Sequence, residues 1–589
     1  MSRVPFATSY RSHTCAELRA GHVGKEVKLS GAVDRYHEDG SFDLRDSYGK
    51  TRVLLGAKPV EMIAQVMNFP DTPPAQRATR LTEESVVTVT GTVRARTEKD
   101  GASPTGEVFV DAGGLEILAP SKPNLIFSPT DDKVSPADKR RHRYMSLRNP
   151  ALHENLRFRT RLAGDLRRFL FARGFLDVQT PMLASRWTPD QTEAFLSVRA
   201  RAEVFALQGR RSNVGEMLMA SGFDRTFEVA RRFSRRKEYG PFEQPEYTVL
   251  EANLAYVDEP DLIALVLQLI GNIGRTTLGE PVGAVARLTS EEALQKYGAG
   301  CPDLRFSLEI LEAGRAIEQV NSPRLRDLIS QRAVRFIRVP AESAAKAGGD
   351  FDKLAAGLGN GGFIDRIAVA PDLTAQVAAG AALDQAAADD AVVAVKAQPG
   401  EVLYAVAGKD PVALGAAAGK LRLALGAAVG PGRRNAFALV TRLPYFRPDA
   451  GGKLTLQGDP LARPVPGELE GPAHELRALA FSVVLNGVRV GGGSVRNHDL
   501  GIQRELFTAL GLGAQEVSAR YGHVLDAFRF GVPPHARFVL GLDRLAALLL
   551  GLASLDDAMA MPKNPDGTDG LARSPSPLSK GIVRGLLGH

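Results

Sequence analysis

The first 118 residues alternate short β-branched segments with turns of Gly, Asp and Ser. Each segment has the length and composition of a strand rather than of a helix. The segments are residues 23–33, 40–55, 85–96 and 106–113. Their spacing predicts a small closed β-barrel of the OB type, a fold that often binds nucleic acid, and a structural or protein-binding barrel is the alternative. Phe42 in the second segment is either an aromatic platform for a base or a core residue.

The residue pattern changes after the barrel and again near residue 288. Four prolines in 119–138 indicate a linker. Apolar residues in 151–174 recur with helical spacing, and residues 221–256 have the pattern of a long β-hairpin. We expect a barrel (1–118), a linker (119–140), the first part of a second domain (141–287), an inserted α/β domain (288–420), the second part of the interrupted domain (421–562) and a C-terminal extension (563–589).

The composition is that of a soluble globular protein in a reducing compartment. Of 589 residues, 44% are hydrophobic, and 74 Lys and Arg against 67 Asp and Glu give a net charge of +7. Cys15 and Cys301 are too few for a disulfide framework or a cysteine-rich zinc site. Because the chain has no apolar leader and no uninterrupted apolar run of membrane length, we expect a cytoplasmic protein without a membrane partner. Arginine clusters at 137–173 and 231–237 favour a polyanionic partner, with solvated helix faces as the alternative.

The sequence contains none of the common nucleotide-binding or metal-binding motifs in a suitable context. The sequence GLGNGG at 357–362 follows a helical segment rather than a strand, so it lacks the context of a dinucleotide-binding loop. The sequence has no P-loop, no HExxH motif and no GxSxG motif, and its ten histidines form no ligand-spaced cluster. We therefore predict no metal-ligand set.

Three segments, in this order, resemble the signature motifs of one enzyme family. They are the predicted helix and strand that end at Pro181, the hairpin FDRTFEVARRFSRRKEYGPFEQPEYTVLE at 223–251, and GVPPHARFVLGLDRLAALLLG at 531–551. RYMSLRNP at 143–150 and GGGSVR at 491–496 are supporting matches. The chain resembles the class II aminoacyl-tRNA synthetases, and among them bacterial-type aspartyl-tRNA synthetase, as a divergent paralogue.

The resemblance implies an α+β multidomain fold and a two-step reaction. The family has an anticodon-binding OB-fold, a catalytic domain built on an antiparallel sheet with flanking helices, and an inserted domain. Its members form homodimers through the first motif. They activate aspartate with ATP and Mg²⁺ and transfer the aspartyl group to tRNA. We expect ATP as the nucleotide and tRNA or another RNA as a partner.

The ATP-binding positions of the family map onto both the hairpin and the last motif. Arg544 matches the arginine that contacts the ATP phosphates, and Arg235 takes the place of the catalytic hairpin arginine if Ser234 is an inserted residue. Glu238 is the candidate replacement for the acids of the hairpin loop. Tyr247 matches the aromatic residue that stacks on adenine.

The substrate-binding positions are only partly retained. Arg496 matches the arginine that recognises the side-chain carboxylate of the amino acid, a task that suits its planar fork. Asp190, Ser212 and Glu251 occupy further positions of the pocket, and Gly215 replaces a substrate-binding lysine.

The metal-binding positions are substituted. The two carboxylates that hold Mg²⁺ in the family are matched by Ser482 and Arg489, and a guanidinium has no acceptor for a cation. Three hypotheses follow. The chain is an aminoacyl ligase with altered substrate or metal use, a synthetase-like pseudoenzyme that binds tRNA or nucleotide, or a paralogue that aminoacylates an acceptor other than tRNA.

Overall fold

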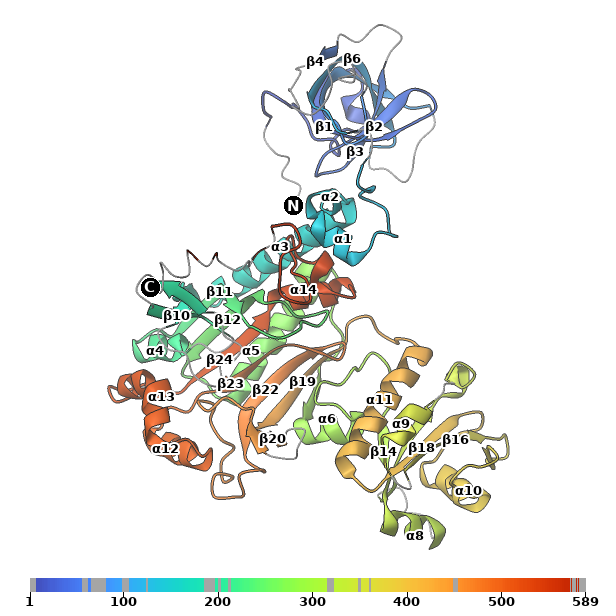
Figure 1. The fold of residues 1–589 in the computed structure, drawn as a ribbon, viewed down its shortest axis with the longest axis vertical. Helices are drawn as coiled ribbons and strands as arrows, with labels where there is room; N and C mark the ends of the chain where they lie inside the picture. Colours follow the sequence, from blue (N-terminus) through green and yellow to red (C-terminus); the bar gives the residue numbers. More distant parts are fainter. Residues whose placement is uncertain are drawn as a thin grey trace. The chain divides into compact units, whose positions relative to one another are not determined.

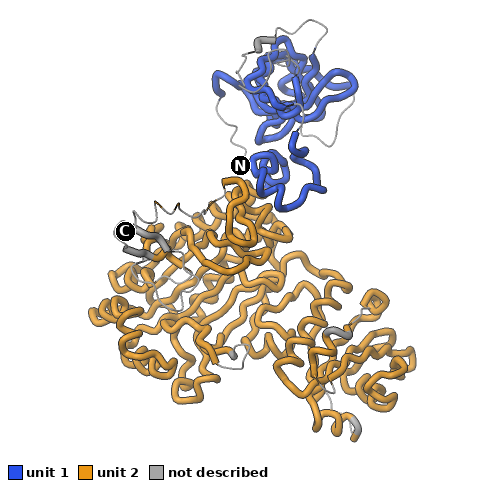
Figure 2. Tube along the Cα trace, viewed as in Figure 1, with its two compact units in different colours: residues 1–154 blue, residues 155–589 orange. Residues whose placement is uncertain are grey.

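The computed structural model forms two compact units, Met1–Glu154 and Asn155–His589 (Figure 2). The structure describes residues 7–55, 62–64, 81–97, 105–122, 125–184, 196–199, 203–209, 213–314, 323–347, 351–359, 362–448, 454–572, 574, 579 and 581.

The first unit contains the expected barrel. Its strands are β1 (Glu26–Tyr36), β2 (Ser41–Arg45), β3 (Lys50–Leu55), β4 (Met62–Ala64), β5 (Val86–Ala95) and β6 (Val108–Ala119). Five of them run in the order β3-β2-β1-β5-β6, and pairing of β3 with β6 closes the barrel. Alternate residues such as Val27, Leu29 and Val33 point inward, as the period of a strand requires. Phe42 is fully buried in the same core, so it packs there and is no exposed platform for a base.

Three helices follow the barrel: α1 (Pro136–Arg141), α2 (Arg143–Ser146) and α3 (Pro150–Phe171), with a short 3-10 turn, η1 (Ala20–His22), near the start of the chain. Ser135 caps α1 by accepting a hydrogen bond from the backbone of Asp138, and Pro136 starts the helix without needing a donor. Leu162 and Leu166 of α3 are buried, which confirms its predicted amphipathic pattern.

An eight-stranded sheet forms the centre of the second unit (Figure 1). Its strands, from one edge to the other, are β13 (Ala286–Thr289), β19 (Phe437–Pro444), β22 (Arg477–Leu485), β23 (Val488–Val495), β24 (His535–Gly541), β12 (Glu246–Ala255), β11 (Arg225–Phe233) and β7 (Leu176–Asp177). Only the two edge pairs are parallel. The hairpin predicted for 221–256 is β11–β12.

Apolar helices cover the sheet and build its core. Residues of α3, α5 (Glu259–Asn272) and α14 (Leu542–Leu550) share one buried cluster with the central strands. The remaining small elements of this unit are β8 (Leu183–Ala184), β9 (Leu196–Arg199), β10 (Glu203–Leu207), α4 (Val214–Ala220), η4 (Ile273–Leu278), α6 (Ser290–Tyr297), β20 (Phe446–Pro448), β21 (Leu454–Leu456), α12 (Leu500–Ala509), α13 (Ala514–Phe528) and η6 (Leu555–Asp557).

The inserted segment has a sheet of its own. Its strands run in the order β14 (Ile310–Glu312), β15 (Ala333–Val339), β18 (Val402–Gly408), β16 (Phe363–Val369) and β17 (Ala375–Val377). Its helices are α8 (Pro323–Gln331), η5 (Ala341–Ser343), α9 (Asp352–Ala356), α10 (Gln385–Ala394) and α11 (Pro411–Val429).

Helix α11 is long and apolar enough to span a membrane by length and composition, but here it packs on β15 and β18. Its apolar residues therefore belong to the core of the insertion. The helix continues to Val429, nine residues past the predicted end of the insertion at 420.

Helices α6 and α11 contact each other through two glycines. Gly298 ends α6 with a φ of +66°, and a Cβ built on Gly419 of α11 would lie 2.5 Å from the Gly298 carbonyl oxygen. No side chain fits between these backbones.

We predict that Gly419→Ala lowers the free energy of unfolding by about 1–3 kcal/mol, because the methyl group forces the two backbones apart. Gly164→Ala in α3 is the control, since its methyl group would meet only the end of the Arg168 side chain. The free energy of unfolding of this control should rise by about 0.5–1 kcal/mol, because alanine favours the helix more than glycine does. Thermal unfolding measures the stability of both variants. An equal increase in stability for Gly419→Ala and Gly164→Ala would contradict the predicted clash.

Candidate functional site

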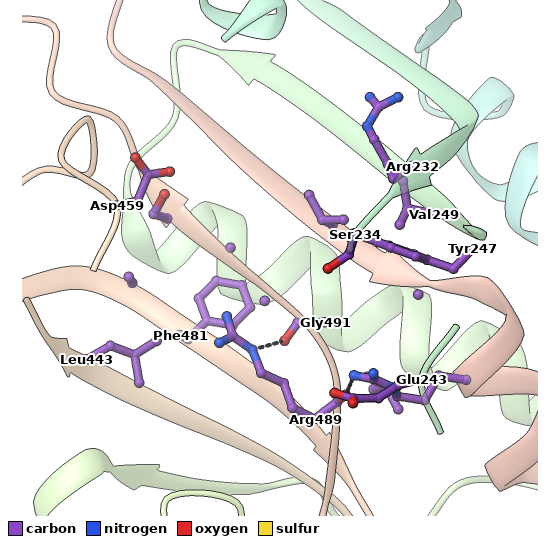
Figure 3. Close-up of a pocket in the computed structure, with 18 of the residues that line it drawn as sticks. Arg232, Ser234, Glu243, Tyr247, Val249, Leu443, Asp459, Phe481, Arg489 and Gly491 are labelled. Carbon is purple, nitrogen blue, oxygen red and sulfur yellow. Dashed lines mark hydrogen bonds between the residues drawn. The ribbon is translucent and has the colours of Figure 1, made fainter. Parts of the chain in front are cut away.

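A pocket of about 560 Å³ opens on one face of the eight-stranded sheet (Figure 3). Strands β11, β12, β22, β23 and β24 and the start of α14 provide most of its lining. Among the residues that the structure describes, seven arginines and three acidic residues line it: Arg232, Arg236, Arg447, Arg489, Arg496, Arg537, Arg544, Glu243, Asp459 and Asp543. The surplus of guanidinium groups favours an anionic ligand.

One group of charges forms a chain across strands β11, β12 and β24. The Arg232 Nη2 atom lies 2.8 Å from Glu251 Oε2 and also contacts Glu228, and Arg537 Nε lies 2.9 Å from Glu251 Oε1. These side chains are almost fully buried. Burial acts to lower the pKa of Arg232, but Glu251 and Glu228 outweigh burial and raise it. The charges are thus balanced within the sheet.

A second group surrounds Arg496, which follows β23. Its guanidinium is 1% exposed, with Nη2 2.6 Å from Glu216 Oε1 and Nη1 2.8 Å from Asp459 Oδ2. Nη1 also donates a hydrogen bond of 3.1 Å to Ser494 Oγ. Burial disfavours the charge of Arg496, but Asp459 and Glu216 together hold its pKa above the ordinary value.

A third group consists of Arg447, Arg489 and Arg544. Arg544 is held by two hydrogen bonds, from Nε to the Phe242 carbonyl at 2.9 Å and from Nη1 to the Arg489 carbonyl at 2.8 Å. Arg489 donates from Nε to the Gly491 carbonyl at 3.1 Å (Figure 3). Burial raises the pKa of the Cys301 thiol, and the charges of all three arginines oppose that shift. All three arginines line the same pocket.

The glycine run of β23 is explained by the sheet itself. A Cβ on Gly491 would collide with the Val539 carbonyl, and one on Gly492 would collide with the Phe481 carbonyl. Because backbone atoms of both neighbouring strands crowd these positions, packing alone requires glycine here, whatever ligand the pocket binds.

The described residues do not fit a protein-held Mg²⁺ ion. Ser482 is buried in β22, and Arg489 brings a positive charge into the pocket. Each acidic residue of the lining pairs with an arginine: Glu243 with Arg236, Asp459 with Arg496, and Asp543 with Arg159. Within the described part of the chain, no three His, Cys, Asp or Glu side chains form a group that could hold a metal.

The structure brings together four of the residues singled out from the sequence. Arg489, Arg496, Arg544 and Tyr247 line the pocket. Ser482 and Glu251 are buried and do not line it. Arg235 and Glu238 are exposed on the hairpin loop and are likewise absent from the lining. Asp190 and Ser212 lie outside the described residues, so their roles stay predictions.

Strand pairing explains the position of Arg235. The backbone N–H of Ser234 donates to the Pro245 carbonyl at 2.9 Å, so the hairpin pairing continues beyond Phe233 and places Ser234 in the pocket lining. Arg236, which donates to Glu243 at 2.7 Å, also lines the pocket. The contribution of Arg235 to catalysis stays a prediction.

Sequence reasoning missed several charged residues of the site. Glu228 and Arg232 share one strand parity, so the period of two in β11 would have placed them on one face. Arg537 and Val539 also share one parity in β24, and both line the pocket. No comparable signal marks Glu216 or Asp459, because their pairing with Arg496 joins segments far apart in the chain.

Comparisons with known proteins agree with this architecture. The family of class II tRNA synthetases (D, K and N) matches residues 136–565. The aspartate–tRNA(Asp/Asn) ligase of Thermotoga neapolitana is 32% identical over 98% of each chain, and the aspartate–tRNA ligase of Bacteroides fragilis is 31% identical over 97% of each.

Solved structures share the fold at lower identity. Asparaginyl-tRNA synthetase from Pyrococcus horikoshii, complexed with asparaginyl-adenylate, matches with a TM-score of 0.56 and 17% identity, over 94% of this chain and 98% of that chain. Asparaginyl-tRNA synthetase from Entamoeba histolytica matches with a TM-score of 0.58 and 14% identity, over 95% and 98%. The chain belongs to the class II aminoacyl-tRNA synthetases, in the aspartyl- and asparaginyl-tRNA synthetase family.

A buried histidine next to the site gives a pH prediction. Burial lowers the pKa of His535 to about 4, and its Nδ1 lies 2.9 Å from the Pro533 carbonyl oxygen. In the unfolded chain His535 takes up a proton below about pH 6.5, which favours unfolding. The contribution of neutral His535 to the stability of the folded state is therefore complete above about pH 6.5. It is lost as the pH falls toward about 4, the pKa of His535 in the folded protein.

Between pH 7 and pH 5 this one group should cost about 2 kcal/mol of unfolding free energy. We expect His535→Gln to reduce the loss by that amount, measured by chemical denaturation at both pH values. An equal pH dependence of the two proteins would contradict the buried, neutral state of His535.

Proposed function

We propose that this chain forms an aminoacyl adenylate from ATP and an amino acid, with arginines in place of a protein-held metal ion. In this step an oxygen of the α-carboxylate attacks the α-phosphorus of ATP. The new P–O bond replaces the bond to the β-phosphate, and pyrophosphate leaves. A hydroxyl of the acceptor then attacks the carbonyl carbon, and AMP is released.

The observation that carries the proposal is the group formed by Arg447, Arg489 and Arg544 in the pocket. Pyrophosphate gains negative charge as it leaves, and fixed cations stabilise that charge best when they need not reorganise. Arg544 meets this condition, because two backbone carbonyls hold its guanidinium. Tyr247 lines the same pocket and offers an aromatic face to adenine.

The family suggests the acceptor and the setting. We propose tRNA as the acceptor, bound partly through the N-terminal barrel, and a homodimer in the cytoplasm. An acceptor other than tRNA is the variant of this proposal that leaves the first step unchanged.

A binding function without catalysis is the second candidate. It is favoured by the substitution at the metal positions, where Ser482 and Arg489 provide no carboxylate. On this reading the pocket still takes up nucleotide, and the chain acts as a synthetase-like pseudoenzyme that binds tRNA or a nucleotide.

Amino-acid-dependent exchange of pyrophosphate into ATP tests the first step. We predict exchange with one of the common amino acids, in the presence or absence of tRNA. Arg544→Ala should lower the exchange rate about tenfold or more, because it removes a charge-assisted contact to the polyphosphate.

Arg504→Ala is the matched control, since Arg504 is exposed on α12 and absent from the pocket lining. It should leave exchange unchanged. If no amino acid supports exchange while calorimetry still detects ATP binding, the ligase proposal is wrong and the binding function holds.

A further inference from the structure

The arginines of the pocket fall into two groups with different charge balance. Arg236, Arg447, Arg489 and Arg544 share the described part of the pocket lining with Glu243, which pairs with Arg236, and with Asp543, which pairs with Arg159. This group carries a net positive charge and suits the polyphosphate of ATP.

In the other group the carboxylates outnumber the arginines. It contains three arginines and four carboxylates: Arg232, Arg496, Arg537, Glu216, Glu228, Glu251 and Asp459. With all seven of these described side chains ionised, one negative charge is in excess among them. The two groups of side chains therefore carry net charges of opposite sign.

The excess negative charge lies beside Arg496. Arg537 and Arg232 match Glu251 and Glu228 in number, and the one guanidinium of Arg496 contacts both Glu216 and Asp459. Glu216 is 1% exposed and does not line the pocket, so it acts from behind the guanidinium. Arg496 lines the pocket, but its charge is already neutralised within the protein.

We infer that this part of the pocket selects an amino acid whose side chain carries no carboxylate, and that Glu216 sets this preference through Arg496. The inference rests on the proposed adenylate chemistry and names the substrate class of the same site. An anionic side chain would be the third acid around one guanidinium, and like charges in a desolvated site exclude it. An uncharged side chain of the same shape meets no such repulsion.

The test compares two adenylate analogues that differ only in this charge. They are the acyl sulfamates of adenosine that carry aspartate and asparagine, and calorimetry measures the affinity of each for the full-length protein. We expect the wild type to bind the asparaginyl analogue at least about tenfold more tightly than the aspartyl analogue.

Substitutions of Glu216 and Asp459 should each change the ratio of the two affinities, and the double variant should change it further. Glu216→Gln and Asp459→Asn each remove one negative charge and should reduce the preference, and the double variant should reverse it. Asp459 is 29% exposed, so its variant tests the inference even if Glu216→Gln fails to fold. Glu505→Gln on the exposed face of α12 is the control and should leave the ratio unchanged.

The affinity ratio separates electrostatic selection from a structural role, because a general loss of packing weakens both analogues alike. Preferred binding of the aspartyl analogue to the wild type, or a ratio that neither variant changes, overturns the inference while adenylate binding stands. If neither analogue nor ATP binds to the wild type, the proposed function fails and this inference fails with it.

Discussion

The side chain of Arg496 is 1% exposed, and a guanidinium with so little access to water is stable only if carboxylates lie beside it. Glu216 comes from helix α4, Asp459 from the loop before β22, and Arg496 from the end of β23. Their pairing joins three separate segments beside the pocket. Removing Arg496 would leave the carboxylate of Glu216, which is itself 1% exposed, as an uncompensated buried charge, which typically costs about 3–5 kcal/mol.

The sheet and the side chains of the pocket depend on different constraints. The fold is that of the family, and in this chain the neighbouring strands leave no room to replace the glycines of β23. The side chains on that framework are free to change the chemistry. Here Arg232, Arg496 and Arg537, each of which contacts at least one carboxylate, line the pocket, and Arg489 adds a further cation to the lining.

Local patterns predicted the elements well and the side-chain partners poorly. The alternation of β11 and β12 and the helical period of α3 depend on neighbours in sequence, and both were predicted. Arg544 and Tyr247 were found because a motif surrounds each of them. Glu216 was missed, because its role depends on Arg496, 280 positions further along the chain. Arg235 was assigned through a presumed insertion at Ser234, and the backbone pairing of Ser234 lay beyond what sequence alone provides.

The central claim is that arginines replace a protein-held metal at the polyphosphate. Calorimetric titration of ATP in excess EDTA and in Mg²⁺ tests it most directly, on the wild type and on Ser482→Asp/Arg489→Glu. We predict wild-type affinities that agree within about threefold between the two conditions, and a double variant that binds ATP only with Mg²⁺. A wild type that binds ATP with Mg²⁺ and not in EDTA would contradict the account.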